Sequence, residues 1–322
     1  MPPVTFIYTN SLDLTADLLI SRLGSEHIFR FNIDLWRDYQ IKVDADGLFI
    51  RNPAGRSVHQ SEIAKFYWRR PHTTARLYPQ REIPKEISYI EEEISYALRD
   101  TLNLLWADGK VVLTEPMADS RIGKLVQLSL ARKYFTVPDY RFVLGSADFL
   151  TETSAAVIVK SLSSERVNRE KTLFTTQVDQ RELDPQTPWF IQEYVPASHD
   201  ITVVYIRGDL FAFELDRSPF VGQTADWREV APEIAVDGWQ PHQLPSELQG
   251  AIQGFMQDLG LHYGRLDLLL TTEGYRFLEV NANGEWAWLD FDNRHGLLER
   301  MANELSPLTP CHPIPINRQI TR

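Results

Sequence analysis

Alternating apolar and polar residues mark two stretches near the C-terminal end of the chain, Arg265–Thr271 and Tyr275–Val280. Both are rich in Leu, Phe, Tyr or Val, with the composition and period of β-strands. The short connection between them ends in Gly274. A three-residue loop, Thr272–Gly274, would place this glycine where a left-handed bulge residue is needed. The pattern therefore predicts a β-hairpin.

Polar side chains interrupt this apolar hairpin. In the predicted register Asp267 faces Glu279, and Asn281 emerges on the same face as Glu279. Two opposed carboxylates repel each other, which predicts a raised pKa for at least one of them. A hard divalent cation removes the repulsion, and two carboxylates with an amide oxygen suit Mg²⁺. The alternative is that both carboxylates lie at the rim of the sheet and pair with Arg265, Arg276 or water.

The rest of the chain alternates between strand and helix periodicity. It opens with a strand, a helix and a strand at Val4–Tyr8, Asp13–Leu23 and His27–Ile33, the start of a small open α/β sheet. Further strands are predicted at Ile41–Val43, Leu48–Arg51, Ile63–Trp68, Ala155–Lys160, Trp189–Val195, Thr202–Ile206 and Leu210–Leu215. Further helices are predicted at Glu86–Leu105, Ile122–Tyr134, Ser246–Leu259 and Gly296–Leu305. From Ser306 onward the prolines and the lack of apolar periodicity are typical of a disordered tail.

Composition narrows the possible partners. The 322 residues include 43% hydrophobic and 24% charged residues, which is ordinary for a soluble globular protein. A net charge of −11 argues against a nucleic-acid partner. The single cysteine, Cys311, excludes an internal disulfide and a cysteine-based zinc site. Neither a signal-peptide pattern nor an apolar run of ~18 residues is visible, so we expect a cytoplasmic protein without a membrane partner.

The hairpin also carries a family resemblance. An Asp on one strand, followed by Glu-x-Asn at the end of the next, resembles the metal-binding signature of ATP-grasp carboxylate ligases. The extension Phe277–Asp290, FLEVNANGEWAWLD, is similar to the microviridin-type peptide ligases, or graspetide synthetases. The resemblance covers Val4–Leu305 and implies an α/β (α+β) ATP-grasp fold. The implied divisions are an N-terminal α/β domain (1–115), a central lid (116–195), a C-terminal metal and ATP domain (196–305) and the tail (306–322).

The resemblance also assigns nucleotide contacts. The residues expected to bind ATP are Lys124, Lys160, Gln192, Glu193, Tyr194 and Asp200. The lysines would contact phosphates, Gln192–Tyr194 would read the adenine edge, and Asp200 would bind the ribose hydroxyls. Lys124 lies in the first turn of a predicted helix, where the helix dipole disfavours a cation unless a bound phosphate reverses the preference.

Three arginines are candidate catalytic residues. The segment FYWRRP is similar to the one that ends the N-terminal sheet in this family, which implies that Arg69 and Arg70 point toward the active site. The alternative is a solvated basic pair at a strand end. The DWR segment ending in Arg228 matches one whose arginine faces the γ-phosphate and the activated carboxylate. One departure is Thr202, because family members commonly have an arginine two residues after Asp200.

The implied reaction is peptide macrocyclisation. ATP would phosphorylate an Asp or Glu side chain of a ribosomally made precursor peptide, with Mg²⁺ held by Asp267, Glu279 and Asn281. A Ser or Thr hydroxyl or a Lys amine would then form a macrolactone or macrolactam. The expected partner is a precursor peptide with leader and core, and a homodimer is left open. The alternatives are a ligase that joins free amino acids or modifies a protein C-terminus, and a non-catalytic peptide-binding protein, which Thr202 favours.

Overall fold

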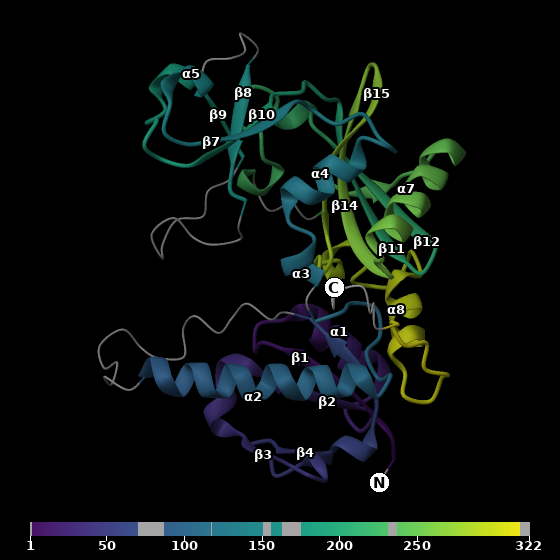
Figure 1. The fold of residues 1–322 in the computed structure, drawn as a ribbon. Helices are drawn as coiled ribbons and strands as arrows, with labels where there is room; N and C mark the ends of the chain where they lie inside the picture. The colour runs from purple at the N-terminus through teal and green to yellow at the C-terminus, as the bar shows by residue number, and fades with distance from the viewer. Residues whose placement is uncertain are drawn as a thin grey trace. The chain divides into compact units, whose positions relative to one another are not determined.

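The computed structural model describes residues 2–69, 87–116, 118–150, 156–162, 175–230 and 237–315 (Figure 1). By their contacts the residues separate into two compact units. The first contains Met1–Arg121, Leu261–Gly264 and Ala282–Arg322, and the second contains Ile122–Gly260 and Arg265–Asn281. The three-domain division stays a prediction. Among the described helices, none combines the length and apolar character that a membrane span requires.

Parallel strands form the centre of the first unit. Their order across the sheet is β2 (Ile28–Asn32), β1 (Val4–Thr9) and β6 (Ile63–Trp68). Helix α1 (Leu14–Leu23) connects β1 to β2, so the predicted β-α-β opening is confirmed. The side chain of Asp13 caps α1 by accepting a hydrogen bond from the backbone of Thr15.

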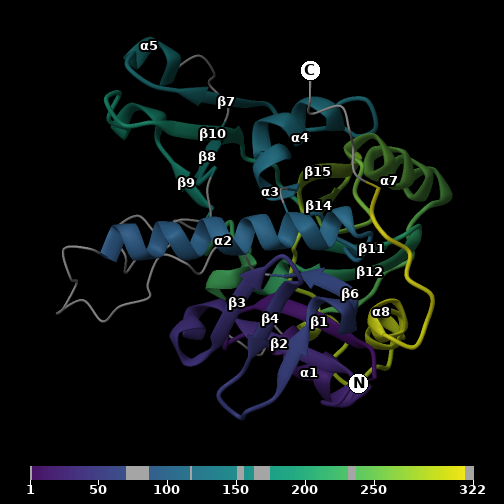
Figure 2. The same ribbon diagram turned by 60° about the horizontal axis from the view of Figure 1, so that its bottom comes forward.

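One face of this sheet is covered by α2 (Ile87–Ala107), as Figure 2 shows. Leu98, Leu102 and Leu105 of this helix pack against Phe6 and Phe66 of the sheet. The antiparallel strands β3 (Gln40–Asp44), β4 (Gly47–Arg51) and β5 (Ser57–His59) join the same core. This aromatic core gives the first unit a stable centre of its own.

Side chains of the parallel sheet bind the end of α8 (Leu297–Leu305). Thr5 Oγ1 donates to the carbonyl of Leu305 at 2.5 Å, and Lys65 Nζ donates to the carbonyl of Glu304 at 2.7 Å. The last carbonyls of a helix have no partner within it, and a cation there also complements the helix dipole. Buried Lys65 therefore has a structural role.

The beginning of α8 is held by Asp290, the acid that closes the aromatic signature. Its buried carboxylate accepts hydrogen bonds from the backbone N–H groups of His295, Leu297 and Leu298, at 2.8, 2.7 and 3.1 Å. The N–H groups of Leu297 and Leu298 belong to the first turn of α8, where the helix itself provides no acceptor. Asp290 is therefore a helix-capping residue.

The expected disordered tail is wrong for residues 306–315. Ile314 is 5% exposed and belongs to the core beneath α2. Its backbone N–H donates to Val111 at 2.9 Å, and its carbonyl accepts from Trp106 Nε1 at 3.1 Å. Lys65 Nζ also donates to Thr309 Oγ1 at 2.8 Å, so contacts at several points order this proline-rich segment. Residues 316–322 lie outside the described part of the chain.

The second unit contains two antiparallel arrangements. In the smaller sheet the order is β7 (Tyr140–Val143), β10 (Trp189–Glu193), β8 (Val157–Lys160) and β9 (Thr176–Val178). In the larger sheet it is β13 (Gln240–Pro241), β12 (Asp209–Asp216), β11 (His199–Ile206), β14 (Tyr263–Thr271) and β15 (Gly274–Asn281). The short helices α3 (Ala118–Arg121) and α5 (Ala147–Leu150) lie in the first and second units, respectively.

Helix α7 (Ser246–Leu259) packs against the larger sheet, with the bounds that its apolar spacing predicts. Phe255 of α7 contacts Phe277 of β15, with ring centroids 5.1 Å apart, and Phe135 stacks on Phe277 at the same separation. Phe135 follows α4 (Lys124–Ala131), which is shorter than the predicted helix. These rings fix the position of β15 in the second unit.

Candidate active site

The hairpin β14–β15 turns more tightly than expected. Thr271 pairs with Gly274, so only the dipeptide Thr272–Glu273 lies between the strands. The predicted three-residue loop is therefore wrong. Gly274 has φ of 105°, a conformation that favours glycine, but it is part of the ladder and not a loop residue.

A β-bulge corrects the register further along the hairpin. Leu268 pairs with Phe277, whereas Asp267 pairs with Glu279, which leaves Leu278 as the extra residue. The predicted opposition of Asp267 and Glu279 is thus confirmed, although a bulge at Leu278 produces it instead of the loop. Without the bulge, Glu279 would point to the opposite face of the sheet.

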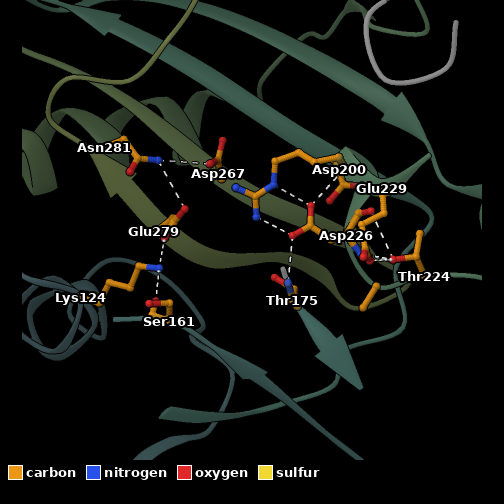
Figure 3. Close-up of polar contacts among 12 residues, drawn as sticks. Lys124, Ser161, Thr175, Asp200, Thr224, Asp226, Glu229, Asp267, Glu279 and Asn281 are labelled. Carbon is orange, nitrogen blue, oxygen red and sulfur yellow. Dashed lines mark hydrogen bonds and ion pairs between the residues drawn. The ribbon is translucent and has the colours of Figure 1, made fainter. Parts of the chain in front are cut away.

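Asn281 lies beside both carboxylates, as Figure 3 shows. Its Nδ2 is 3.4 Å from Glu279 Oε1 and 3.5 Å from Asp267 Oδ2. Coordination of a metal ion would use the amide oxygen instead of this nitrogen. Within the described ranges no group of three or more His, Cys, Asp or Glu could hold a metal ion, so the candidate set is two carboxylates and one amide.

Two lysines offset the charge of Glu279. Lys124, the first residue of α4, places Nζ 3.1 Å from Glu279 Oε2 and donates to the carbonyl of Ser161 at 2.8 Å (Figure 3). Lys160 ends β8. Burial would raise the pKa of Glu279, but Lys124 and Lys160, with a smaller contribution from Arg265, lower it to about 2. The expected rise in pKa is therefore wrong for Glu279, because cations from other elements converge on it.

Burial lowers the pKa of Lys160, which also lies close enough to Lys124 and Arg228 to be affected by their charges. Glu279 and Asp226 oppose this effect. The structure therefore brings both predicted phosphate-binding lysines to one carboxylate.

Arg228 reaches the same group of charges from the segment after β12. Its Nε and Nη2 bind Asp226 Oδ1 and Oδ2 at 2.7 and 2.5 Å, a bidentate pair. Asp226 also accepts from the backbone of Thr175 at 3.1 Å. The hydrogen bond to Asp226 is the main cause of a raised pKa of Arg228, and Glu279 and Asp267 add to it. With half of its side chain exposed, Arg228 is accessible to a ligand.

Asp200 is held by an arginine that the sequence analysis missed. Arg217 Nη1 lies 2.7 Å from Asp200 Oδ2, and both residues are buried. Burial nevertheless raises the pKa of Asp200 to about 6. The hairpin register contains the relevant signal, because Asp200 pairs with Leu215, two residues before Arg217. The ribose contact of Asp200 stays a prediction.

Gln192 is buried in β10 at 1% exposure, and both of its side-chain polar atoms lack hydrogen-bond partners in the described part of the chain. Ile191, its neighbour, packs into the core of the smaller sheet. Because side chains alternate, Gln192 and Phe190 face the other way, and Phe190 pairs with Lys160. Gln192 and Lys160 therefore share one face.

The next two residues are less available for nucleotide contacts. The carboxylate of Glu193 is exposed and accepts from the backbone of Asp139 at 3.2 Å. The backbone N–H of Tyr194 already donates to the carbonyl of Ala156 at 2.9 Å. Reading of the adenine edge by this amide would require that bond to break.

No protein-family model and no curated protein matches the chain. Solved structures do. A RiPP-associated ATP-grasp ligase of Chryseobacterium gregarium, in complex with ADP and a leader and core peptide, has a TM-score of 0.80, with 21% identity over 94% of this chain and 96% of that one. The macrocyclase MdnC of Microcystis aeruginosa, bound with precursor peptide MdnA, has a TM-score of 0.76, with 21% identity over 94% and 99%. The chain has the ATP-grasp fold.

A third similar structure is the ATP-grasp ligase PsnB complexed with a minimal precursor, Mg and ADP. It has a TM-score of 0.67, with 18% identity over 95% of this chain and 98% of that one. The predicted fold class is therefore confirmed. Identities of 18–21% establish the fold alone.

In this ATP-grasp chain Arg69 lies in the first unit and is completely buried. It forms ion pairs with Asp13 at 3.4 Å and Glu285 at 2.6 Å, and it donates to the carbonyl of Gly284 at 3.1 Å. The alternative interpretation, a solvated basic residue at a strand end, is therefore wrong for Arg69. Its contacts hold the turn that follows β15. Its catalytic role stays a prediction. Arg70 lies outside the described residues.

Proposed function

We propose that this protein is an ATP-dependent carboxylate ligase that acts on a ribosomally made precursor peptide. It would activate Asp or Glu side chains as acyl phosphates and join them to Ser or Thr hydroxyls or Lys amines. The observation that carries the proposal is the convergence of Lys124, Lys160 and Arg228 on the Asp267–Glu279 pair within the second unit. Similar structures solved with ADP, Mg and precursor peptides support it.

The residues present fit a magnesium nucleotide. Asp267, Glu279 and Asn281 would hold Mg²⁺, which would neutralise phosphate charge when bound. When a nucleotide binds, the ammonium groups of Lys124 and Lys160 can bind its phosphate oxygens in place of the carboxylate of Glu279. The buried, unpartnered amide of Gln192 offers both a donor and an acceptor to a polar ligand group on the face of Lys160.

Arg228 is suited to the transfer step. The peptide carboxylate would attack the γ-phosphorus as ADP leaves, and the hydroxyl or amine would then displace phosphate from the acyl carbon and lose its proton to solvent. The half-exposed guanidinium can bind two oxygens at once, where negative charge develops. No side chain among the described residues of the second unit stands out as a dedicated general base.

The first experiment measures nucleotide binding by thermal shift with Mg²⁺ and AMPPNP. We expect the wild-type protein to be stabilised and Lys160→Met to lose this stabilisation. Lys133→Met is the matched control, because the exposed Lys133 has Asp258 as its ion-pair partner, at 3.8 Å. A wild-type protein that shows no shift would contradict the proposal.

The second experiment supplies ATP, Mg²⁺ and short peptides rich in Thr, Ser, Asp and Glu, encoded beside this reading frame. Release of ADP, with loss of one water from the mass of the peptide per ring, is the expected result. Release of ADP with free amino acids alone would favour the other ligase class. Peptide binding without ADP release would favour a non-catalytic protein.

A further inference from the structure

A single carboxylate, that of Asp226, holds the turn that carries Arg228. Asp226 precedes the short 3-10 helix Trp227–Glu229, and its Oδ1 accepts from the backbone N–H of Arg228 at 3.1 Å. The same oxygen accepts from Arg228 Nε at 2.7 Å, and Oδ2 accepts from Nη2. One residue therefore holds both the backbone and the side chain of the candidate catalytic arginine.

The carboxylate of Asp226 also binds the segment that enters the smaller sheet. Its Oδ2 accepts from the backbone N–H of Thr175 at 3.1 Å (Figure 3). Val159 of β8 pairs with Thr176 of β9. The next residues of these two segments are Lys160 and Thr175, which therefore lie at the same end of the sheet. Asp226 thus connects the turn after β12 to the strand end that carries a candidate phosphate-binding lysine.

The charge of Asp226 is buried close to two cations. Its side chain is 3% exposed, whereas that of Arg228 is 50% exposed. Burial would raise the pKa of Asp226, but hydrogen bonds and the charge of Arg228 lower it, so the carboxylate is ionised at neutral pH. The same charge acts on Lys160, where it opposes the effect of burial. A buried anion near both cations offsets their mutual repulsion and allows them to stay close before a phosphate arrives.

Direct contact with a ligand suits Asp226 poorly. Each of its oxygens accepts two hydrogen bonds, one pair from Arg228 alone and the other from Arg228 and Thr175. An ionised carboxylate has about four lone-pair sites, so these donors use its capacity, and its charge would repel phosphate oxygens. Any effect of Asp226 on the reaction would therefore pass through the groups that it holds.

We propose that Asp226 is a positioning residue for phosphoryl transfer: it fixes the guanidinium of Arg228 near Lys160, in the orientation that meets negative charge as it develops on the phosphate oxygens. A donor that is already oriented needs no reorganisation during the reaction, which is what makes such groups effective. The inference rests on the proposed ligase function, and it adds a residue that touches neither nucleotide nor metal.

The test is a double-mutant cycle of Asp226→Asn and Arg228→Ala, with ATP-dependent peptide turnover and AMPPNP affinity as readouts. Asparagine keeps the shape of the side chain but removes its charge and one acceptor. Asp226→Asn alone should lower kcat roughly 10–100-fold, as for loss of a residue that orients an active-site group, with little change in AMPPNP affinity. In the Arg228→Ala background the same substitution should lower kcat no further, because the guanidinium through which Asp226 acts is gone.

Glu229→Gln is the matched control, because Glu229 belongs to the same turn, is exposed and accepts from Thr224 Oγ1. Its kcat should equal that of wild type. Asp226→Glu keeps the charge on a longer side chain and should reduce kcat less than Asp226→Asn, and it replaces the asparagine variant in the cycle if that variant does not fold.

Three results would overturn the inference. The first is an Asp226→Asn or Asp226→Glu protein with the kcat of wild type. The second is an equal loss of kcat in both backgrounds of the cycle, which would show that Asp226 acts independently of Arg228. The third is a loss of AMPPNP affinity as large as the loss of turnover, which would indicate a role in binding. A wild type without ATP-dependent peptide turnover would instead refute the proposed function itself.

Discussion

Replacing Glu279 by glutamine tests whether charges in the metal-free protein attract or repel. Glu279 faces Asp267, but it also lies 3.1 Å from Lys124 and close to Lys160. The pKa of its carboxyl group is lowered to about 2, so attraction to the lysines outweighs both burial and repulsion. Glu279→Gln should therefore destabilise the protein.

The magnitude follows from the pKa. One unit corresponds to about 1.36 kcal/mol, so a carboxyl group that moves from its ordinary 4.5 to about 2 contributes at most about 3 kcal/mol. The side chain of Glu279 is 20% exposed, and both lysines can turn toward solvent once it is neutral. We therefore expect a loss of about 1–2 kcal/mol in the free energy of unfolding at pH 7.

Chemical denaturation provides the assay, with Glu273→Gln as the control. Glu273 lies in the same hairpin and pairs with Arg276, but it is 77% exposed, so its variant should change stability by less than ~0.5 kcal/mol. The folded pKa of Glu279 is depressed, so its contribution is present above pH ~4.5 and is lost as the pH falls toward 2. A Glu279→Gln protein as stable as wild type at pH 7, or more stable, would refute this reasoning.

The remaining predictions concern turnover, helix capping and pH. Arg228→Ala should reduce ATP-dependent peptide turnover by roughly 10²–10³-fold while changing nucleotide affinity little, and lysine should rescue it poorly; steady-state kinetics with affinity measurements check this. Asp290→Ala should lower the free energy of unfolding by ~1–2 kcal/mol, because two backbone donors of α8 and one just before it lose their acceptor, whereas Asp292→Ala, at an exposed position, should not. Asp200 has a raised pKa, so its ionisation opposes folding as the pH rises from 3.8 to about 6. Urea titrations should therefore show that the free energy of unfolding of Asp200→Asn increases relative to that of wild type over this range. A difference that does not change with pH would contradict this prediction.

Local patterns predicted much of this fold. The apolar spacing of α7 gives its bounds, and the helical pattern over Asp13–Leu23 locates α1, with Asp13 as its cap instead of its first helical residue. The prediction for the tail is wrong because scattered contacts order residues 306–315, among them the buried Ile314 and the hydrogen bond from Lys65 to Thr309, and scattered contacts leave no periodic signal. A periodic pattern arises only where one face of an element is buried along several turns or residues, so isolated buried residues are not predicted by it.

The candidate site was predictable where it lies within one hairpin and less so where distant elements meet. The opposition of Asp267 and Glu279 follows from strand register, but the bulge at Leu278 that maintains it has no clear sequence signal. The charge on Glu279 depends on Lys124 and Lys160, which no local rule places beside it. The expected repulsion was therefore wrong, although the residues were correctly identified.

The bulge at Leu278 separates the tip of the hairpin from its base. The pairing changes register there. The connection at Thr272–Glu273 and the pair of Asp267 and Glu279 therefore do not share one continuous hydrogen-bonded ladder. A change in the length of the connection at the tip can therefore be accommodated at the bulge, with the pairing of Asp267 and Glu279 kept. For the same reason the exposed tip is a suitable position for an inserted epitope or a fluorescent reporter. Such a reporter could follow ligand binding without moving Asp267 or Glu279.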